Sequence, residues 1–446
     1  MPGADAVAHA IERARARGAD AADAVAFEGS SLSAAYRMGE IEDLERSEGR
    51  DLGLRVFLGR RQAFVSSNDW SPGGLDGLAE RALAMARVTP EDRYCGLADP
   101  ERLARVLPAL DLDDGDEPSA ERLLAAAREA EASALSIPGI VNSQGGSASW
   151  GRSVAYLATS HGFSGSYSAS HHSIACTVLA GEGEAMERDY ESSLACHAAD
   201  LAAPETVGRA AAERALRRLR PRRIRTARVP VIFDPRVGRS LVGHLLGAIA
   251  GSAVARGTSF LKNRMGEAVL AGGLTVIDDP HRPRGLGSRP FDGEGVATAR
   301  MALVEDGILR TWLLDSASAR QLGLATTGHA TRGTGGPPGP GASNVHLAAG
   351  ACTPSELIAD IEAGLYVTDL IGMGVNGVTG DYSRGAAGLW IEEGELAYPV
   401  NEVTIAGNLK DMFRALTAAN DLDFRYAVNV PTLRVDGMTV AGPGEA

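Results

Sequence analysis

Pairs of strand-like runs that meet at tight-turn signals recur along this chain, and they constrain its fold more than any other feature. In the C-terminal half, Asp306-Gly307, Glu393-Gly394 and Asp436-Gly437 each separate two such runs. A glycine at this place suits the positive φ of a two-residue hairpin turn. No regular series of crossover helices, which parallel strands would require, alternates with these runs. We therefore predict that the C-terminal part is an antiparallel, barrel-like β domain.

The N-terminal part combines helical and strand-like patterns. Residues 4–17 have the apolar spacing of an amphipathic helix, and residues 71–87 begin with Ser-Pro and continue with the same spacing. Between them, residues 22–67 alternate apolar and polar side chains, and turns are expected at Gly39 and Gly59. These patterns predict a small antiparallel sheet with two helices, in a mixed α/β region.

The middle of the chain begins with residues 107–118, whose acids and two prolines are typical of a connector. Ser119 is expected to cap an alanine-rich helix, and residues 137–199 return to strand-like alternation with many serines, whose polar side can face solvent or a wide groove. The basic residues 207–223 predict a helix with solvated arginines near its C-terminus, and the alternative is a site for a phosphate or an acidic partner. The predicted class is α+β, with an N-terminal α/β domain over residues 1–106, a central α/β segment over 107–225 and a C-terminal β-rich domain over 226–446.

Composition excludes several classes of function. The formal charge is 44 − 57 = −13, and so acidic a chain is poorly suited to binding a nucleic-acid backbone. The four cysteines lie far apart and form no C-x-x-C pair, which argues against a zinc knuckle or a disulfide framework. The N-terminal residues mix acids and bases without the apolar core of a signal peptide, and no run approaches the ~18 apolar residues of a membrane span. We expect a cytoplasmic protein that does not contact a membrane.

The stretch Arg236–Arg256 is predicted to be a helix that faces the core. Leu241, Leu245 and Ile249 recur every four residues and so lie on one stripe of a helix. The strand-like residues 229–234 lead directly into it.

A second stripe of the same predicted helix consists of Gly243, Gly247 and Gly251, with His244 beside it. Glycine inside a helix costs roughly 1 kcal/mol relative to alanine, so we expect a neighbouring backbone to pack closely against this stripe. His244 is interpreted first as a polar contact at the edge of the stripe.

Two further patterns are candidates for a site. Gly372, Gly374 and Gly377 form G-x-G-x-x-G, but the following residues are not helical, so we predict a glycine-rich turn and not a dinucleotide site. His171 and His172 are adjacent, so in a strand they point to opposite faces and cannot share a metal.

Several long segments identify a resemblance. SLVGHLLGAIAG, GTSFLKNRMGE, EVTIAGNLKDMFRALTAANDL and PTLRVDGMTVAG in the C-terminal half, with ERSEGRDLGLRVFLGRRQAFVSSNDWS near the N-terminus, closely resemble the TldD/PmbA family. Within that family the match is to the PmbA branch, also called TldE. The resemblance covers nearly the whole chain and implies an N-terminal α/β part and a C-terminal part built largely of antiparallel strands.

The same resemblance bears on zinc. The TldD branch carries H-E-x-x-x-H on the helix that corresponds to Arg236–Arg256, and a downstream cysteine completes its zinc site. In this chain Gly243 occupies the position of the first histidine, His244 that of the glutamate and Ala248 that of the second histidine. Residues 420–431 contain no cysteine. The resemblance thus implies that this chain holds no metal and that no residue of it is confidently catalytic.

The family implies a function for such a subunit. It would pair with a TldD-like metallopeptidase chain, which carries the zinc, and help to enclose a cavity that unfolded peptides enter. His244, His329 and Arg332 are the candidate substrate-binding residues, and the Gly/Pro-rich loop Thr331–Ala342 could line the entrance. Two alternatives remain: a peptidase active on its own through ligands such as His244 and His329, and a peptide-binding scaffold without a protease partner.

Overall fold

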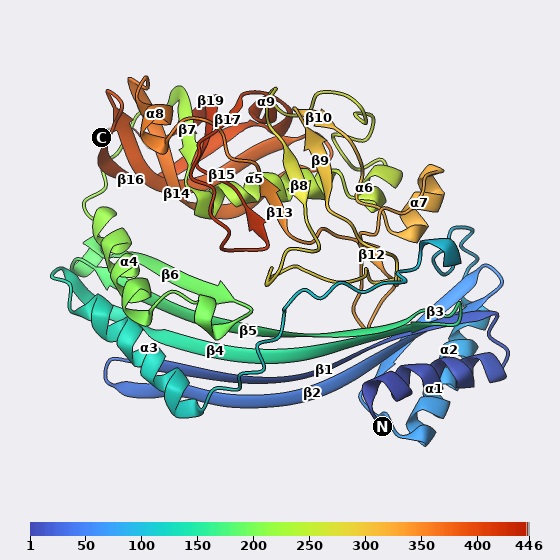
Figure 1. Ribbon diagram of the computed structural model, residues 1–446. Coiled ribbons are helices and arrows are strands. Elements are labelled where there is room, and N and C mark those ends of the chain that lie inside the picture. The colour runs from blue at the N-terminus through green and yellow to red at the C-terminus, as the bar shows by residue number, and fades with distance from the viewer. Residues whose placement is uncertain (443, 445–446) are drawn as a thin grey trace.

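The computed structural model describes residues 1–442 and 444, so residues 443, 445 and 446 of the predicted C-terminal domain lie outside the described residues. A long, curved sheet formed by the N-terminal half lies beneath a C-terminal region of shorter sheets and helices (Figure 1). No helix among the described residues has the length and apolar character needed to cross a membrane.

The N-terminal sheet has six antiparallel strands in the order β3-β2-β1-β4-β5-β6. They are β1 (Ala21–Arg37), β2 (Glu40–Leu58), β3 (Arg61–Ser67), β4 (Ile140–Thr159), β5 (Ser164–Ala180) and β6 (Glu187–Ala195). The turns at Gly39 and Gly59 are confirmed, and both glycines have positive φ. The predicted small sheet of residues 22–67 is only half of the observed one, because β1 pairs along most of its length with β4. One sheet therefore takes strands from both of the first two predicted domains.

Four helices cover one face of this sheet. They are α1 (Gly3–Ala16), α2 (Pro72–Val88), α3 (Ala120–Leu135) and α4 (Pro204–Arg217). The first pair packs at one end of the sheet and the second pair at the other (Figure 1). Ser71 and Ser119 cap α2 and α3 through their hydroxyls, as a serine before a helix should. The basic helix ends at Arg217, earlier than predicted, because Pro221 cannot continue it.

The opposite face of the sheet carries small polar side chains toward the C-terminal region. Ser33, Ser149 and Ser173 lie side by side across three strands, and the hydroxyls of Ser149 and Ser173 are 2.7 Å apart. Burial alternates along β5, so this face is open while the helix-bearing face is buried. The predicted polar side of the serine-rich strands is therefore confirmed.

Five strands of the C-terminal region form a closed ring, in the order β7-β14-β15-β16-β19 with β16 pairing back to β19. They are β7 (Ala227–Phe233), β14 (Ala363–Val375), β15 (Asp381–Glu392), β16 (Glu395–Asn408) and β19 (Leu433–Ala441). The barrel-like prediction is confirmed, with one difference: β7 and β14 run parallel. All other neighbours in the ring are antiparallel.

Shorter elements complete this region. The remaining strands are β8 (Val276–Asp278), β9 (Met301–Glu305), β10 (Ile308–Leu309), β11 (Ala330–Thr331), β12 (Gly339–Pro340), β13 (Val345–Leu347), β17 (Leu416–Ala418) and β18 (Val428–Asn429). The helices are α5 (Pro235–Ala248), α6 (Gly251–Ala255), α7 (Ser316–Leu322), α8 (Pro354–Ile358) and α9 (Leu409–Arg414). Outside this region, 3₁₀ turns lie at Pro100–Arg102, Gly183–Ala185 and Ala198–Asp200.

Two of the three predicted C-terminal hairpins are confirmed. Asp306-Gly307 joins β9 to β10, and Glu393-Gly394 joins β15 to β16. The prediction of a hairpin at Asp436-Gly437 is wrong, because these residues form a bulge inside the single strand β19. The predicted glycine-rich turn is also wrong for Gly372 and Gly374, which lie in β14.

Candidate functional site

Helix α5 is fixed by its N-terminus and by its apolar stripe. Asp234 caps the helix, accepting a hydrogen bond of 2.9 Å from the backbone N–H of Arg236. Leu241, Leu245 and Ile249 are buried in the largest core cluster. The predicted inward stripe of this helix is confirmed.

The single helix predicted over Arg236–Arg256 is wrong, because the chain leaves the helix after Ala248. The backbone N–H of Leu313 donates to the carbonyl of Ile249 at 3.0 Å, and the N–H of Gly251 donates to the carbonyl of Leu313 at 2.8 Å. These strand-like bonds replace helical ones and divide the stretch into α5 and α6. The competing segment lies some sixty residues downstream, which is why the local sequence does not reveal the break.

The glycine stripe does not behave uniformly. Gly243 and Gly247 are exposed, and nothing lies within 4 Å of a Cβ built on either one. The predicted close backbone packing is therefore wrong at these two positions within this chain. It is confirmed at Gly251, where a Cβ would lie 2.9 Å from the carbonyl oxygen of Leu313.

His244 packs edge-on against Tyr382, with ring centroids 5.9 Å apart and an interplanar angle of 74°. Its Nε2 and the Tyr382 hydroxyl are both buried, and neither has a hydrogen-bond partner among the described residues. Burial lowers the pKa of His244, and the nearby positive charge of Arg384 lowers it further. The ring is therefore held in its neutral form.

The residues on α5 do not fit a zinc ion. Gly243 and Ala248 have no ligating atom, and Ala248 is buried. His244 alone supplies one nitrogen, whereas zinc sites in proteins use three or four ligands. Across residues 1–442 and 444, no group of three or more His, Cys, Asp or Glu side chains is placed to hold a metal.

A cavity of about 260 Å³ lies at the N-terminus of α5. It is lined by Arg214, Asp234, Pro235, Arg236, Tyr366, Asp421, Asp423, Arg425, Tyr426, Asn429 and Val430. Most of its charges are already paired, since Arg236 binds Asp189 at 2.7 Å and Arg425 binds Glu191 at 2.6 Å. The cavity offers hydrogen bonds and ion pairs, and its lining contains no histidine or cysteine.

The structure places the other two predicted substrate-binding residues away from α5. The ring of His329 is 2 % exposed, with Nε2 2.9 Å from Asp278 Oδ2 and Nδ1 2.8 Å from the Thr327 hydroxyl. The Arg332 side chain is 1 % exposed and lies 2.8 Å from Asp23 Oδ1, at the contact with the N-terminal sheet. His244, His329 and Arg332 thus have separate sets of neighbours.

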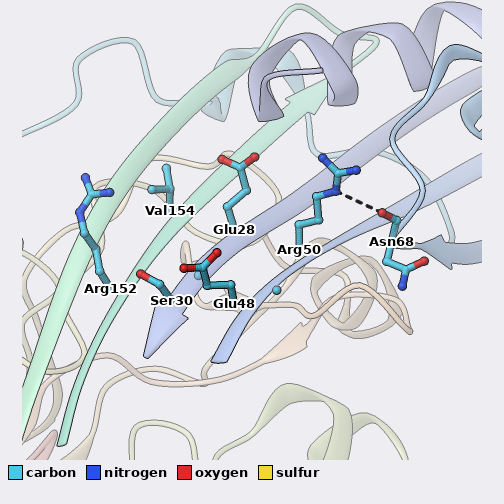
Figure 2. A pocket seen from close by; sticks show the side chains of 9 residues that line it. Glu28, Ser30, Glu48, Arg50, Asn68, Arg152 and Val154 are labelled. Atoms are coloured by element: carbon cyan, nitrogen blue, oxygen red, sulfur yellow. Dashed lines mark hydrogen bonds between the residues drawn. The ribbon is translucent and has the colours of Figure 1, made fainter. Parts of the chain in front are cut away.

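A hollow of about 710 Å³ lies on the helix-bearing face of the N-terminal sheet. Figure 2 shows Glu28, Arg50, Arg152 and Val154 projecting from neighbouring strands to the same side of the sheet. Arg50 Nε donates to the carbonyl of Asn68 at 3.3 Å, shown as a dashed line. The hollow contains none of the predicted site residues and is open and charged.

Sequence reasoning missed a buried group of charges around Arg332. Asp23 pairs with both Arg55 and Arg332, and Glu294 lies 4.0 Å from Arg55. Burial, with the neighbouring Glu294, raises the pKa of Asp292 to about 7. These residues come from distant segments of the chain, and no local pattern marks them.

Comparisons with known proteins bear on the whole chain. Three profiles of the PmbA/TldA metallopeptidases match it: domain 1 over residues 22–86, the central domain over 113–219 and the C-terminal domain over 226–442. "Metalloprotease PmbA" of Escherichia coli O157:H7 is 40 % identical over 440 residues, which cover 98 % of this chain and 96 % of that protein. A "Metalloprotease TldD homolog" of Haemophilus influenzae is 28 % identical over 218 residues, or 45 % of each chain.

Solved structures share the fold. A Bacteroides thetaiotaomicron protein named as a modulator of DNA gyrase has a TM-score of 0.91 and 28 % identity, with 98 % of each chain covered. TldE from Thermococcus kodakarensis has a TM-score of 0.87 and 20 % identity, with 98 % of this chain and 100 % of that chain covered. Together with the full-length match to the Escherichia coli protein, these findings establish that the chain belongs to the PmbA/TldD family.

Proposed function

We propose that this chain is the TldE-like subunit of a TldD–TldE-type metallopeptidase that processes or degrades unfolded peptides, and that it contributes no zinc ligand. The observation that carries the proposal is the pair of residues on α5 at the positions that correspond to the zinc ligands of the TldD branch. Gly243 and Ala248 stand where the resemblance places the two zinc-binding histidines, and neither has a side-chain atom that can bind a metal. The zinc and the reacting water belong to the partner chain in this proposal.

The open polar face of the N-terminal sheet supports a role in binding extended peptides. Its strands carry serine side chains, among them Ser149 and Ser173, whose hydroxyls are only partly buried on this face. Hydroxyls can hydrogen-bond to the backbone of an extended chain whatever its side chains are, and strand addition would take place at the edge strands β3 and β6. Cytoplasmic residence and the identity of the partner belong to the same proposal.

The test is a comparison of the isolated chain with the complex. The chain is purified alone and after co-expression with a TldD-like partner, and both samples are analysed for zinc and for cleavage of an unfolded peptide. We expect zinc and hydrolysis that a chelator abolishes in the complex, and neither in the isolated chain. Chelator-sensitive hydrolysis by the isolated chain would overturn the proposal.

Two substitutions distinguish the alternative of an independently active peptidase. His244→Ala and His329→Ala are introduced into the complex, with thermal unfolding used to identify loss of fold. We expect His244→Ala to retain hydrolysis, since its ring packs against Tyr382 and has no metal-binding neighbours. Loss of both zinc and hydrolysis in folded His244→Ala protein would favour the alternative.

A further inference from the structure

A second cavity, of about 240 Å³, lies where two loops of the C-terminal region meet the open face of the N-terminal sheet. Its lining comes from β1, β4, β5, the short strand β11 and the two loops: Val25, Phe27, Ala155, Tyr156, Leu157, Tyr167, Arg289, Phe291, Asp292, Gly293, Ala330, Thr331 and Arg332. In Figure 1 the loops near β12 reach down to the sheet at this end of the molecule. The volume is below that of drug-sized sites, so it suits a group about as large as one amino-acid residue.

One wall of this cavity is aromatic and rigid. Tyr167 packs edge-on against Phe291 with ring centroids 5.5 Å apart, and Phe163 packs on Phe291 at 5.0 Å. Phe27 adds a further ring to the lining. Such a wall favours an apolar or aromatic side chain over a small inorganic ion.

The other wall carries two arginines with spare hydrogen-bonding capacity. Arg289 donates from Nη2 to the carbonyl of Gly341 at 2.9 Å and from Nη1 to that of Ala330 at 3.4 Å. The Nε groups of Arg289 and Arg332 are buried and have no acceptor among the described residues. A buried donor without an acceptor is unfavourable, and a carboxylate is the acceptor that a guanidinium fits best.

The acidic residues beside these arginines do not remove the arginines' preference for a carboxylate ligand. Asp23 is shared by Arg332 and Arg55. Both oxygens of Asp292 already accept backbone N–H groups, from Glu294 and Val296 on one oxygen and from Ala330 on the other. Burial opposes the ionisation of both acids, raising the pKa of Asp292 to about 7 and that of Glu294 above its ordinary value.

We propose that this cavity binds a small carboxylate that carries an aromatic or aliphatic side chain, with Arg289 and Arg332 on the carboxylate and the aromatic wall on the side chain. The C-terminal residue of a peptide and a free N-acylated amino acid share this chemistry. Assigning the peptide terminus as the natural occupant rests on the proposed function, whereas carboxylate binding does not.

The test uses the isolated full-length chain, so it does not depend on a protease partner. N-acetyl-phenylalanine and N-acetyl-phenylalaninamide are titrated against the chain by isothermal titration calorimetry, with acetate as a third ligand. We expect saturable binding of the acid and at least ten-fold weaker binding of the amide and of acetate. Equal affinities for acid and amide, or no saturable binding of the acid at millimolar concentration, would overturn the proposal.

Substitutions locate the binding. Ala155→Leu fills the cavity from β4. Val154→Leu is its matched control, because the side chain of Val154 projects to the opposite face of the sheet. We expect Ala155→Leu to reduce affinity at least ten-fold and Val154→Leu to leave it unchanged. Arg289→Gln provides a second test that keeps the pairs around Asp23 intact, with the same expected loss. Unchanged affinity in both Ala155→Leu and Arg289→Gln would place the ligand elsewhere and refute the assignment.

A peptide series distinguishes the source of the carboxylate. Tetrapeptides that end in phenylalanine are compared with free and amidated C-termini. Binding of the free-terminus peptide alone supports a peptide C-terminus as the occupant. Binding of N-acetyl-phenylalanine without either peptide supports the cavity as a site for a free carboxylate and would separate it from the proposed peptide function.

Discussion

The two exposed glycines of α5 allow a quantitative test of how the chain is packed. Gly243 and Gly247 lie inside the helix with open space where a Cβ would be. Replacing a glycine by alanine inside an exposed helix removes a backbone-entropy disadvantage of about 0.5–1 kcal/mol. The double variant Gly243→Ala, Gly247→Ala should therefore raise the free energy of unfolding of the isolated chain by about 1–2 kcal/mol.

The measurement is urea unfolding of the isolated chain followed by circular dichroism. Gly251→Ala is the matched control from the same stripe, because its new Cβ would lie 2.5 Å from Leu314 Cδ2 and 2.9 Å from the carbonyl oxygen of Leu313. Forcing a methyl group into such a contact lowers the unfolding free energy by about 1–3 kcal/mol, so Gly251→Ala should unfold at a lower urea concentration than the wild type. A lower midpoint for the Gly243, Gly247 double variant, with an unchanged denaturant slope, would refute the inference that this face is open.

Three further predictions concern the core and its charges. Leu245→Ala should cost about 2–5 kcal/mol of unfolding free energy in urea, because the side chain is buried, while the same change at the half-buried Leu246 should cost less. Burial opposes ionisation of Asp189, but its hydrogen bond and ion pair with Arg236 outweigh that and lower its pKa from the ordinary 3.8. The stability that ionised Asp189 contributes is therefore present above pH 3.8 and is lost as the pH falls below it. The difference in unfolding free energy between the wild type and Asp189→Asn should accordingly become smaller at low pH. A difference that stays constant between pH 7 and pH 3 would argue against the ion pair. Tyr382→Phe should be neutral or stabilising by about 1 kcal/mol in thermal unfolding, because it removes a buried hydroxyl with no partner among the described residues.

Sequence patterns predicted the elements whose causes are local. Ser71 and Ser119 cap their helices because a serine hydroxyl accepts a free N–H of the first turn wherever it stands in that position. Asp306-Gly307 and Glu393-Gly394 form hairpins because their residues adopt positive φ between paired strands.

Where the local structure depends on contacts with distant parts of the chain, the same patterns gave wrong predictions. Gly437 has a φ of 75°, the same as Gly307, yet Asp436-Gly437 forms a bulge. The reason is that β7 pairs with β19 on both sides of the bulge, so the strand continues instead of turning back. Likewise, helix α5 ends at Ala248 because Leu313 forms backbone hydrogen bonds with Ile249 and Gly251.

The candidate site was predictable only in part. The apolar stripe of α5 follows from helical spacing, and so does the position of His244 beside it. The cavity between Arg289 and Phe291 was not predictable, because its walls come from strands and loops that only the complete fold brings together. No spacing rule connects residues that meet across two halves of a molecule.

The closed ring of strands has a consequence for how the protein is made. Val229 of β7 pairs with Met438 of β19, and β19 follows the other four strands of the ring in the chain, so it leaves the ribosome after all of them. Until then the nascent chain exposes open edges at β7 and β16, where other chains can add strands. Translation that stops before residue 433 should therefore yield a polypeptide that recruits chaperones or aggregates, even though the other four strands of the ring are present.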